Sequence, residues 1–159
     1  MISDTDLYAP GRGDALWAWK SFLRGHHPIL MDFGIIGGVN PPDPSAWPIP
    51  FTAFEPARYA ALRRADGLIE MEPGGDLSST GYALANPGKE YLVLQPNEPA
   101  APLTLLLEPG SYSVEWFGVQ GRETVPADDV TVETATHVSL GEPSEASRPA
   151  VLCMRRTGD

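Results

Sequence analysis

Residues 111–119, SYSVEWFGV, alternate polar and apolar side chains over most of their length. Successive side chains of an extended strand point to opposite faces, so Tyr112, Val114 and Trp116 share one face. A period of two is typical of a strand with one face in a hydrophobic core. We therefore predict a strand here, with Trp116 and Tyr112 buried on its inner face.

Short segments of similar character lie on both sides of this strand. The connectors between them, such as NPGK and EPGS, are typical turn sequences. The candidate strands are TGYALAN (80–86), EYLVLQP (90–96), PLTLLLE (102–108), DDVTVETA (128–135), HVSLGEP (137–143) and AVLCMRRT (150–157). So many short strands in about 80 residues predict a mainly β fold, with an antiparallel β-sandwich over residues 79–159.

The first 78 residues have a different pattern. Residues 1–13 are expected to form a loose leader. The expected elements that follow are a helix at about 14–24, a strand at about 28–33, a Pro/Gly loop at 34–54 and a helix at about 55–71, which Gly67 can break. A helix followed by a strand that ends on an aspartate is typical of one step of a (β/α)8 barrel. The chain is too short for a whole barrel of about 200 residues or more. We therefore interpret residues 1–78 as a barrel remnant.

The composition excludes several classes of function. The formal net charge is −10 and the isoelectric point is about 4.6, which disfavours binding to nucleic acid. Cys153 is the only cysteine, so neither an intrachain disulfide nor a cysteine-based zinc site is expected. We expect no transmembrane segment and no membrane partner, because no apolar run approaches about 20 residues. The N-terminus lacks the pattern of a secretory signal, so a cytoplasmic location is expected for the chain as it stands.

Several segments together resemble a known family. They are ALWAWKSFLRG (15–25), HHPILMD (26–32), MEPGGDLSSTGYALANPGKEYLVLQP (71–96) and YSVEWFGVQGRE (112–123). Their order and spacing resemble the C-terminal portion of apiosidase-like, cellulase-type glycoside-hydrolase proteins. The resemblance implies a (β/α)8 barrel followed by a small β-sandwich, often labelled a collagen-binding domain. Proteins of this family are often exported. The chain departs from the pattern in lacking the first six or seven barrel units.

A catalytic site is not predicted. Asp32 is the one candidate, because it follows a barrel-like strand, but glycoside hydrolysis normally needs two carboxyl groups across the scissile bond. Asp43 and Glu55 can in principle approach it from the following loop. Without an enclosed cleft to perturb a pKa, we interpret Asp32 as a surface or capping residue.

Three aromatic residues are candidates for carbohydrate binding: Trp47, Tyr82 and Phe117. Trp47 is the best of them, because a proline-stiffened loop can present its flat face to a sugar ring. It can equally fold back onto the protein. No metal site and no cofactor are predicted, since the adjacent His26 and His27 point to opposite faces of an extended strand.

The leading functional hypothesis is a non-catalytic accessory module of glycoside-hydrolase-like origin, with a structural or weak carbohydrate-binding role. One alternative is a partial hydrolase that completes a barrel with another chain. Another is a structural protein that forms a homodimer through Trp17, Trp19 and Phe22, whose side chains a complete barrel would cover. These residues can instead pack onto the sandwich and the helix at 55–71, and we favour the dimer.

Overall fold

The computed structural model describes residues 2–4, 15–29, 67–96, 102–141 and 148–158. Its first elements are strand β1 (Ile2–Asp4), helix α1 (Ala15–Phe22) and strand β2 (His27–Ile29), and β1 pairs with β2 in parallel. The expectation of a loose leader over 1–13 is thus wrong for residues 2–4. A parallel strand pair with a helix between its strands in sequence is a βαβ unit, which occurs in α/β folds in general, barrels included.

The helix predicted at about 14–24 corresponds to α1. Its end is set by Gly25, which has a φ of +75°, a left-handed conformation that costs glycine little. The amide of Gly25 donates to the carbonyl of Phe22 at 2.9 Å. The close approach of Pro73 also favours glycine, because a Cβ here would lie 2.6 Å from the Pro73 ring.

The segment before the sandwich contains short turns. Helix η2 (Leu68–Glu70), strand β3 (Glu72–Pro73) and helix η3 (Gly75–Leu77) follow one another. The loop expected at 34–54 and most of the helix expected at 55–71 lie outside the described residues. At its described end the expected helix is a 3₁₀ turn, and Met71 is already extended.

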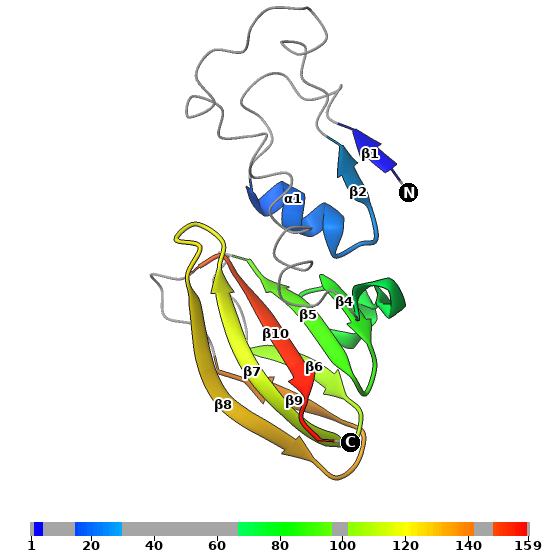
Figure 1. The fold of residues 1–159 in the computed structure, drawn as a ribbon, viewed down its shortest axis with the longest axis vertical. Helices are drawn as coiled ribbons and strands as arrows, with labels where there is room; N and C mark the ends of the chain where they lie inside the picture. The colour runs from blue at the N-terminus through cyan, green and yellow to red at the C-terminus, as the bar shows by residue number, and fades with distance from the viewer. Residues whose placement is uncertain (1, 5–14, 30–66, 97–101, 142–147, 159) are drawn as a thin grey trace, which may run out of the picture.

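The strands predicted beyond residue 79 are all present, with shifted ends. They are β4 (Ala83–Asn86), β5 (Glu90–Gln95), β6 (Leu103–Leu107), β7 (Gly110–Gly118), β8 (Thr124–Val132), β9 (Thr136–Leu140) and β10 (Ala150–Arg156). A six-stranded sheet has the order β3-β4-β5-β10-β7-β8, and β6 pairs with β9 in a second sheet. All pairs in both sheets are antiparallel. Figure 1 shows the two layers of this mainly β fold.

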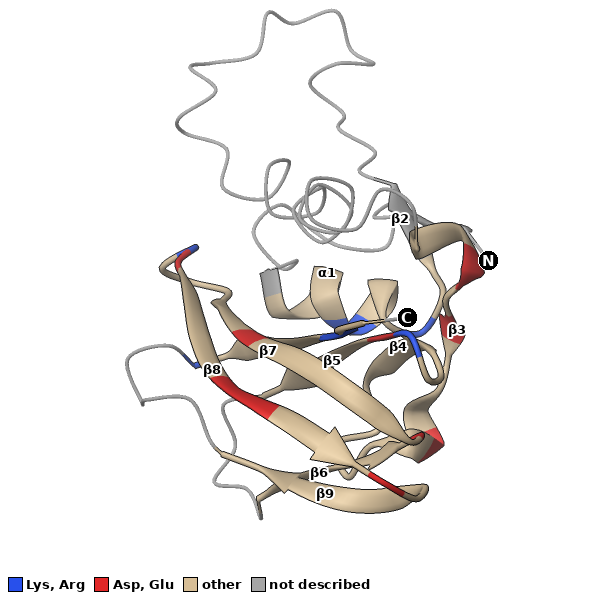
Figure 2. Cartoon of the chain, turned by 60° about the horizontal axis from the view of Figure 1, so that its bottom comes forward, with Lys and Arg blue, Asp and Glu red and all other residues tan. Residues whose placement is uncertain are grey.

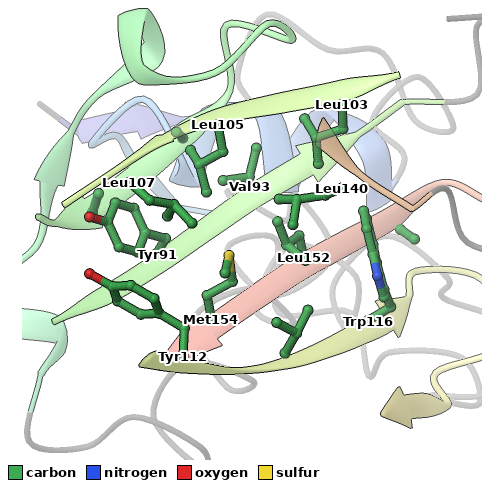
Figure 3. Close-up of a cluster of buried hydrophobic side chains, with 14 residues drawn as sticks. Tyr91, Val93, Leu103, Leu105, Leu107, Tyr112, Trp116, Leu140, Leu152 and Met154 are labelled. Atoms are coloured by element: carbon green, nitrogen blue, oxygen red, sulfur yellow. The ribbon is translucent and has the colours of Figure 1, made fainter. Parts of the chain in front are cut away.

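The first hydrophobic core lies between the two sheets. From the small sheet, β6 contributes three leucines at alternate positions, as its pattern of burial shows. From the large sheet, Tyr112, Val114 and Trp116 of β7 point into the same space, as the sequence predicts. Figure 3 shows Trp116 at one end of this core and the two tyrosine rings at the other.

A second hydrophobic core covers the opposite face of the six-stranded sheet. Here Trp19, Phe22 and Leu23, from α1 and its C-terminal end, pack with buried residues of the sheet, such as Phe117 and Cys153. Figure 2 shows α1 on one side of the sheet and the β6-β9 pair on the other. The central strands β5 and β10 are therefore buried on both faces, which explains why their sequences are apolar runs without alternation.

The edge strand β8 begins four residues before the predicted segment. It contains Pro126, which a strand tolerates at a sheet edge because no ladder hydrogen bond is needed there. The register with β7 shifts between Tyr112 and Val114, which marks a β-bulge or irregularity near Asp128 and Asp129. Proline, bulges and charge are features that discourage edge-to-edge association of sheets.

Two tyrosines join the strand ends at one side of the first core. The Tyr91 hydroxyl accepts hydrogen bonds from the amides of Gly88 at 2.8 Å and Glu108 at 3.3 Å. The Tyr112 hydroxyl donates to the carbonyl of Glu108 at 2.7 Å. Burial, and next the neighbouring Tyr91, raise the pKa of Tyr112 to about 12, so this donor keeps its proton at ordinary pH.

Removing the Tyr91 hydroxyl should destabilise the protein. We expect Tyr91→Phe to lower the free energy of unfolding by about 1 to 3 kcal/mol, because two amides lose their acceptor. Urea denaturation measures the change. Tyr82→Phe is the control, because it removes the same hydroxyl from a half-buried ring outside this pair of tyrosines. Equal stability of Tyr91→Phe and the wild type would contradict this role.

Gln95 is a polar residue at a fully buried position at the end of β5. Within the described part of the chain, neither polar atom of its amide meets a hydrogen-bond partner. An unsatisfied buried amide costs about 1 to 3 kcal/mol. We expect Gln95→Met, of similar length, to raise the unfolding free energy by that amount. The exposed Gln120→Met is the control, with no change expected. A loss of stability in Gln95→Met would show that the amide is satisfied.

Candidate functional site

An open polar depression lies where three segments of the chain meet. They are the turn at 67–70, the β4–β5 connection at 86–90 and the C-terminal end of the chain at 155–158. The depression has a volume of about 580 Å³. Figure 2 shows basic and acidic residues close to one another near the C-terminus.

Glu70 and Lys89 form an ion pair on one side of this depression. The Lys89 Nζ lies 3.0 Å from the Glu70 Oε2, and the Asn86 amide donates to the same oxygen at 2.9 Å. The hydrogen bond from Lys89, then its charge and then the Asn86 amide lower the pKa of Glu70. Glu70 therefore stays ionised further into acid than an ordinary glutamate, and the pair weakens only as the pH falls through this lowered pKa.

Glu90 and Arg155 form a second ion pair on the neighbouring strands β5 and β10, in direct cross-strand register. The Arg155 Nε lies 3.3 Å from the Glu90 Oε1. The Glu90 side chain is only 10% exposed, whereas that of Arg155 is 55% exposed. A mostly buried carboxylate and a half-exposed guanidinium thus lie side by side in the lining of the depression.

Glu70 is suited to charge pairing rather than to donating a proton near neutral pH. A general acid in glycoside hydrolysis needs a raised pKa so that it holds a proton near neutral pH. The pKa of Glu70 is shifted in the opposite direction. What the depression offers is a set of charged and amide groups that can bind a polar ligand.

The residues singled out from the sequence do not meet at one place. Trp47, Asp32, Asp43 and Glu55 lie outside the described residues. Tyr82 is half-buried, and two cations cover its ring, one from α1 and one from just after it. Lys20 Nζ lies 5.2 Å and Arg24 Cζ 4.5 Å from the ring centroid. Its ring is thus already engaged by cation–π contacts.

Phe117 is not an exposed aromatic residue. It is buried, and its ring centroid lies 5.9 Å from that of Trp19. The interpretation of Phe117 as a sugar-binding platform is therefore wrong. The cause is the second core, which covers the sheet face on which Phe117 lies.

Most of the side chains expected at a homodimer interface are buried by contacts within this chain. Trp19 is fully buried, Phe22 is buried, and their rings meet edge to face at 6.2 Å. Trp17 is half-buried. Packing of this helix onto the sandwich is thus the alternative that the structure contains, whereas pairing with a second chain stays a prediction.

Metal ligands do not gather in the described part of the structure. Among those residues, no group of three or more His, Cys, Asp and Glu side chains is placed to hold a metal ion. His137 is exposed on β9, and His26 is half-buried after α1. No helix in the described ranges is long and apolar enough to cross a membrane.

The structure resembles solved glycoside hydrolases. One is described as "Glycoside hydrolase", with a TM-score of 0.56 and 10% identity over 96% of this chain. Another is a glycoside hydrolase family 5 protein from Bacteroides vulgatus ATCC 8482, with a TM-score of 0.56 and 13% identity over 94% of this chain.

The chain spans 39% and 38% of the length of these two structures. At such identities the likeness shows a glycoside-hydrolase-like fold. No family model and no curated protein matches the sequence.

Proposed function

We propose that this chain is a non-catalytic accessory module of glycoside-hydrolase-like origin, in which the β-sandwich supports a barrel-type segment. The observation that carries this proposal is the second hydrophobic core. In it, residues of α1 and residues of the sandwich sheet form one continuous apolar cluster. A sheet face that is apolar over its central strands needs such a cover.

The chemistry of this core supports a structural role. Trp19, Phe22 and Leu23 are buried against the sheet. Fully burying an apolar side chain contributes about 1.5 to 3 kcal/mol. Three such side chains are enough to hold a short helix that would not be stable alone in water.

The aromatic candidates give less support to carbohydrate binding. Phe117 is buried, and the ring of Tyr82 is covered by Lys20 and Arg24. Trp47 stays a candidate on sequence grounds alone. A structural role is therefore the better supported half of the hypothesis.

A hydrolysis assay tests the non-catalytic part. We expect the chain to release no reducing sugar from aryl glycosides or plant polysaccharides, because hydrolysis of this kind needs two positioned carboxyl groups in a cleft. Reducing-sugar release is measured for the wild type and for Asp32→Asn. Steady release that disappears in Asp32→Asn would contradict the proposal and favour the partial-hydrolase alternative. Glu115→Gln, outside the polar depression, is the control for nonspecific effects of losing a carboxylate.

A further inference from the structure

The guanidinium of Arg156 is held in place at the polar depression. Its Nη1 donates to the carbonyl of Gly88 at 3.1 Å. A Cβ on Gly110 would lie 3.4 Å from the Arg156 Cζ, so the group also lies close to the first residue of β7. Gly88 has a φ of +82°, which lets the β4–β5 turn present its carbonyl to this arginine.

Because the other cations of the depression form ion pairs, the Arg156 guanidinium is the one that can bind an anionic ligand. The carboxylates of the depression already have cations, since Glu70 pairs with Lys89 and Glu90 pairs with Arg155. Arg156 forms no ion pair with any other residue that the structure describes. A guanidinium has five N–H donors in a planar fork that matches a carboxylate. The contact with Gly88 occupies only part of this capacity.

The other polar groups in the lining indicate which further groups the ligand should carry. Asn86 and Lys89 offer donors, and the half-exposed Glu70 carboxylate offers acceptors, which suits hydroxyl groups. The lining carries three cations, Lys89, Arg155 and Arg156, and two carboxylates, so its one unbalanced positive charge matches a monoanion. A volume of about 580 Å³ is large enough for a sugar ring.

We propose that the depression binds a uronic acid residue, with the sugar carboxylate on Arg156 and its hydroxyls on Asn86 and Glu70. This inference does not depend on the supporting role proposed above. The source of the uronate is either a free sugar acid or an acidic polysaccharide, and both present the same carboxylate.

Titration of the whole chain tests the proposal. Isothermal calorimetry or amide chemical shifts are followed with D-glucuronate, D-galacturonate, oligogalacturonides, D-glucose and inorganic phosphate. We expect a uronate to bind at least about tenfold more tightly than glucose or phosphate, and Arg156→Gln to weaken this binding about tenfold. Arg24→Gln removes the same charge just after α1, outside the depression, and should bind as the wild type does. Tighter binding of the oligomers than of the monomers identifies the polysaccharide as the source.

Four results would overturn the proposal. One is binding of glucose as tight as that of the uronates, and another is phosphate that binds equally well at the same residues, which would mark an unspecific anion patch. The third is wild-type affinity in an Arg156→Gln protein that is shown to be folded by circular dichroism. Absence of any uronate binding at high millimolar concentration counts with them.

Discussion

Replacing Trp116 with alanine should lower the free energy of unfolding by about 3 to 5 kcal/mol, the usual cost of removing a large aromatic side chain from a core. Trp116 is 6% exposed and packs between the two sheets. Its indole closes the end of the core opposite Tyr91 and Tyr112 (Figure 3). Alanine leaves most of the volume of the indole empty in this core, so most of the transfer energy is lost.

Chemical denaturation with two probes, fluorescence and far-ultraviolet circular dichroism, measures this loss. Ile69→Ala is the matched control, because Ile69 is 93% exposed and its truncation should change stability by less than about 0.5 kcal/mol. A loss below about 1 kcal/mol in Trp116→Ala would show that Trp116 does not fill the core.

The sandwich strands were predictable because the sequence carries their periodicity. In β6 and in most of β7, buried side chains alternate with more exposed ones, as expected for a strand with one covered face. The prediction of the bounds of β8 was the least accurate, because Pro126 and the acidic pair after it do not resemble a strand interior. These residues fit only because β8 lies at the sheet edge.

The error at Phe117 has a physical cause. Phe117 follows Trp116 and so lies on the opposite face of β7, which in a two-layer sandwich faces solvent. The helix α1 adds a third layer on that face, and the pairing of α1 with the sheet depends on contacts nearly a hundred residues apart in sequence. No local sequence pattern indicates a contact between residues so far apart in the chain.

The polar depression was missed for a similar reason. Its residues come from three separate segments, and the pairs Glu70–Lys89 and Glu90–Arg155 join distant positions. Each of these residues, considered alone, resembles an ordinary charged surface residue. Strand β1 was missed because three residues are too few to show a period, and its partner β2 lies beyond the helix.

Helix α1 and the sandwich should come apart when Trp19 is removed. We expect Trp19→Ala to lower the free energy of unfolding by about 3 to 5 kcal/mol, because Trp19 is fully buried and contacts both Phe22 and Phe117. Without it, α1 keeps only Phe22 and Leu23 as large buried anchors on the sheet. A helix of eight residues is not stable without such packing.

Limited trypsin digestion gives a local readout of this separation, because Lys20 and Arg24 lie on α1 and just after it. Cleavage there should become at least about tenfold faster in Trp19→Ala, in line with the larger population of the open state when docking loses 1.4 kcal/mol or more. Trp17→Ala is the matched control, since it removes the same side chain from a half-buried position of the same helix, and a clearly smaller effect is expected. Unchanged cleavage, together with a stability loss below about 1 kcal/mol, would show that α1 does not depend on the sheet. The supporting role proposed for the sandwich would then be wrong, whereas uronate binding at Arg156 would stand or fall by its own titration.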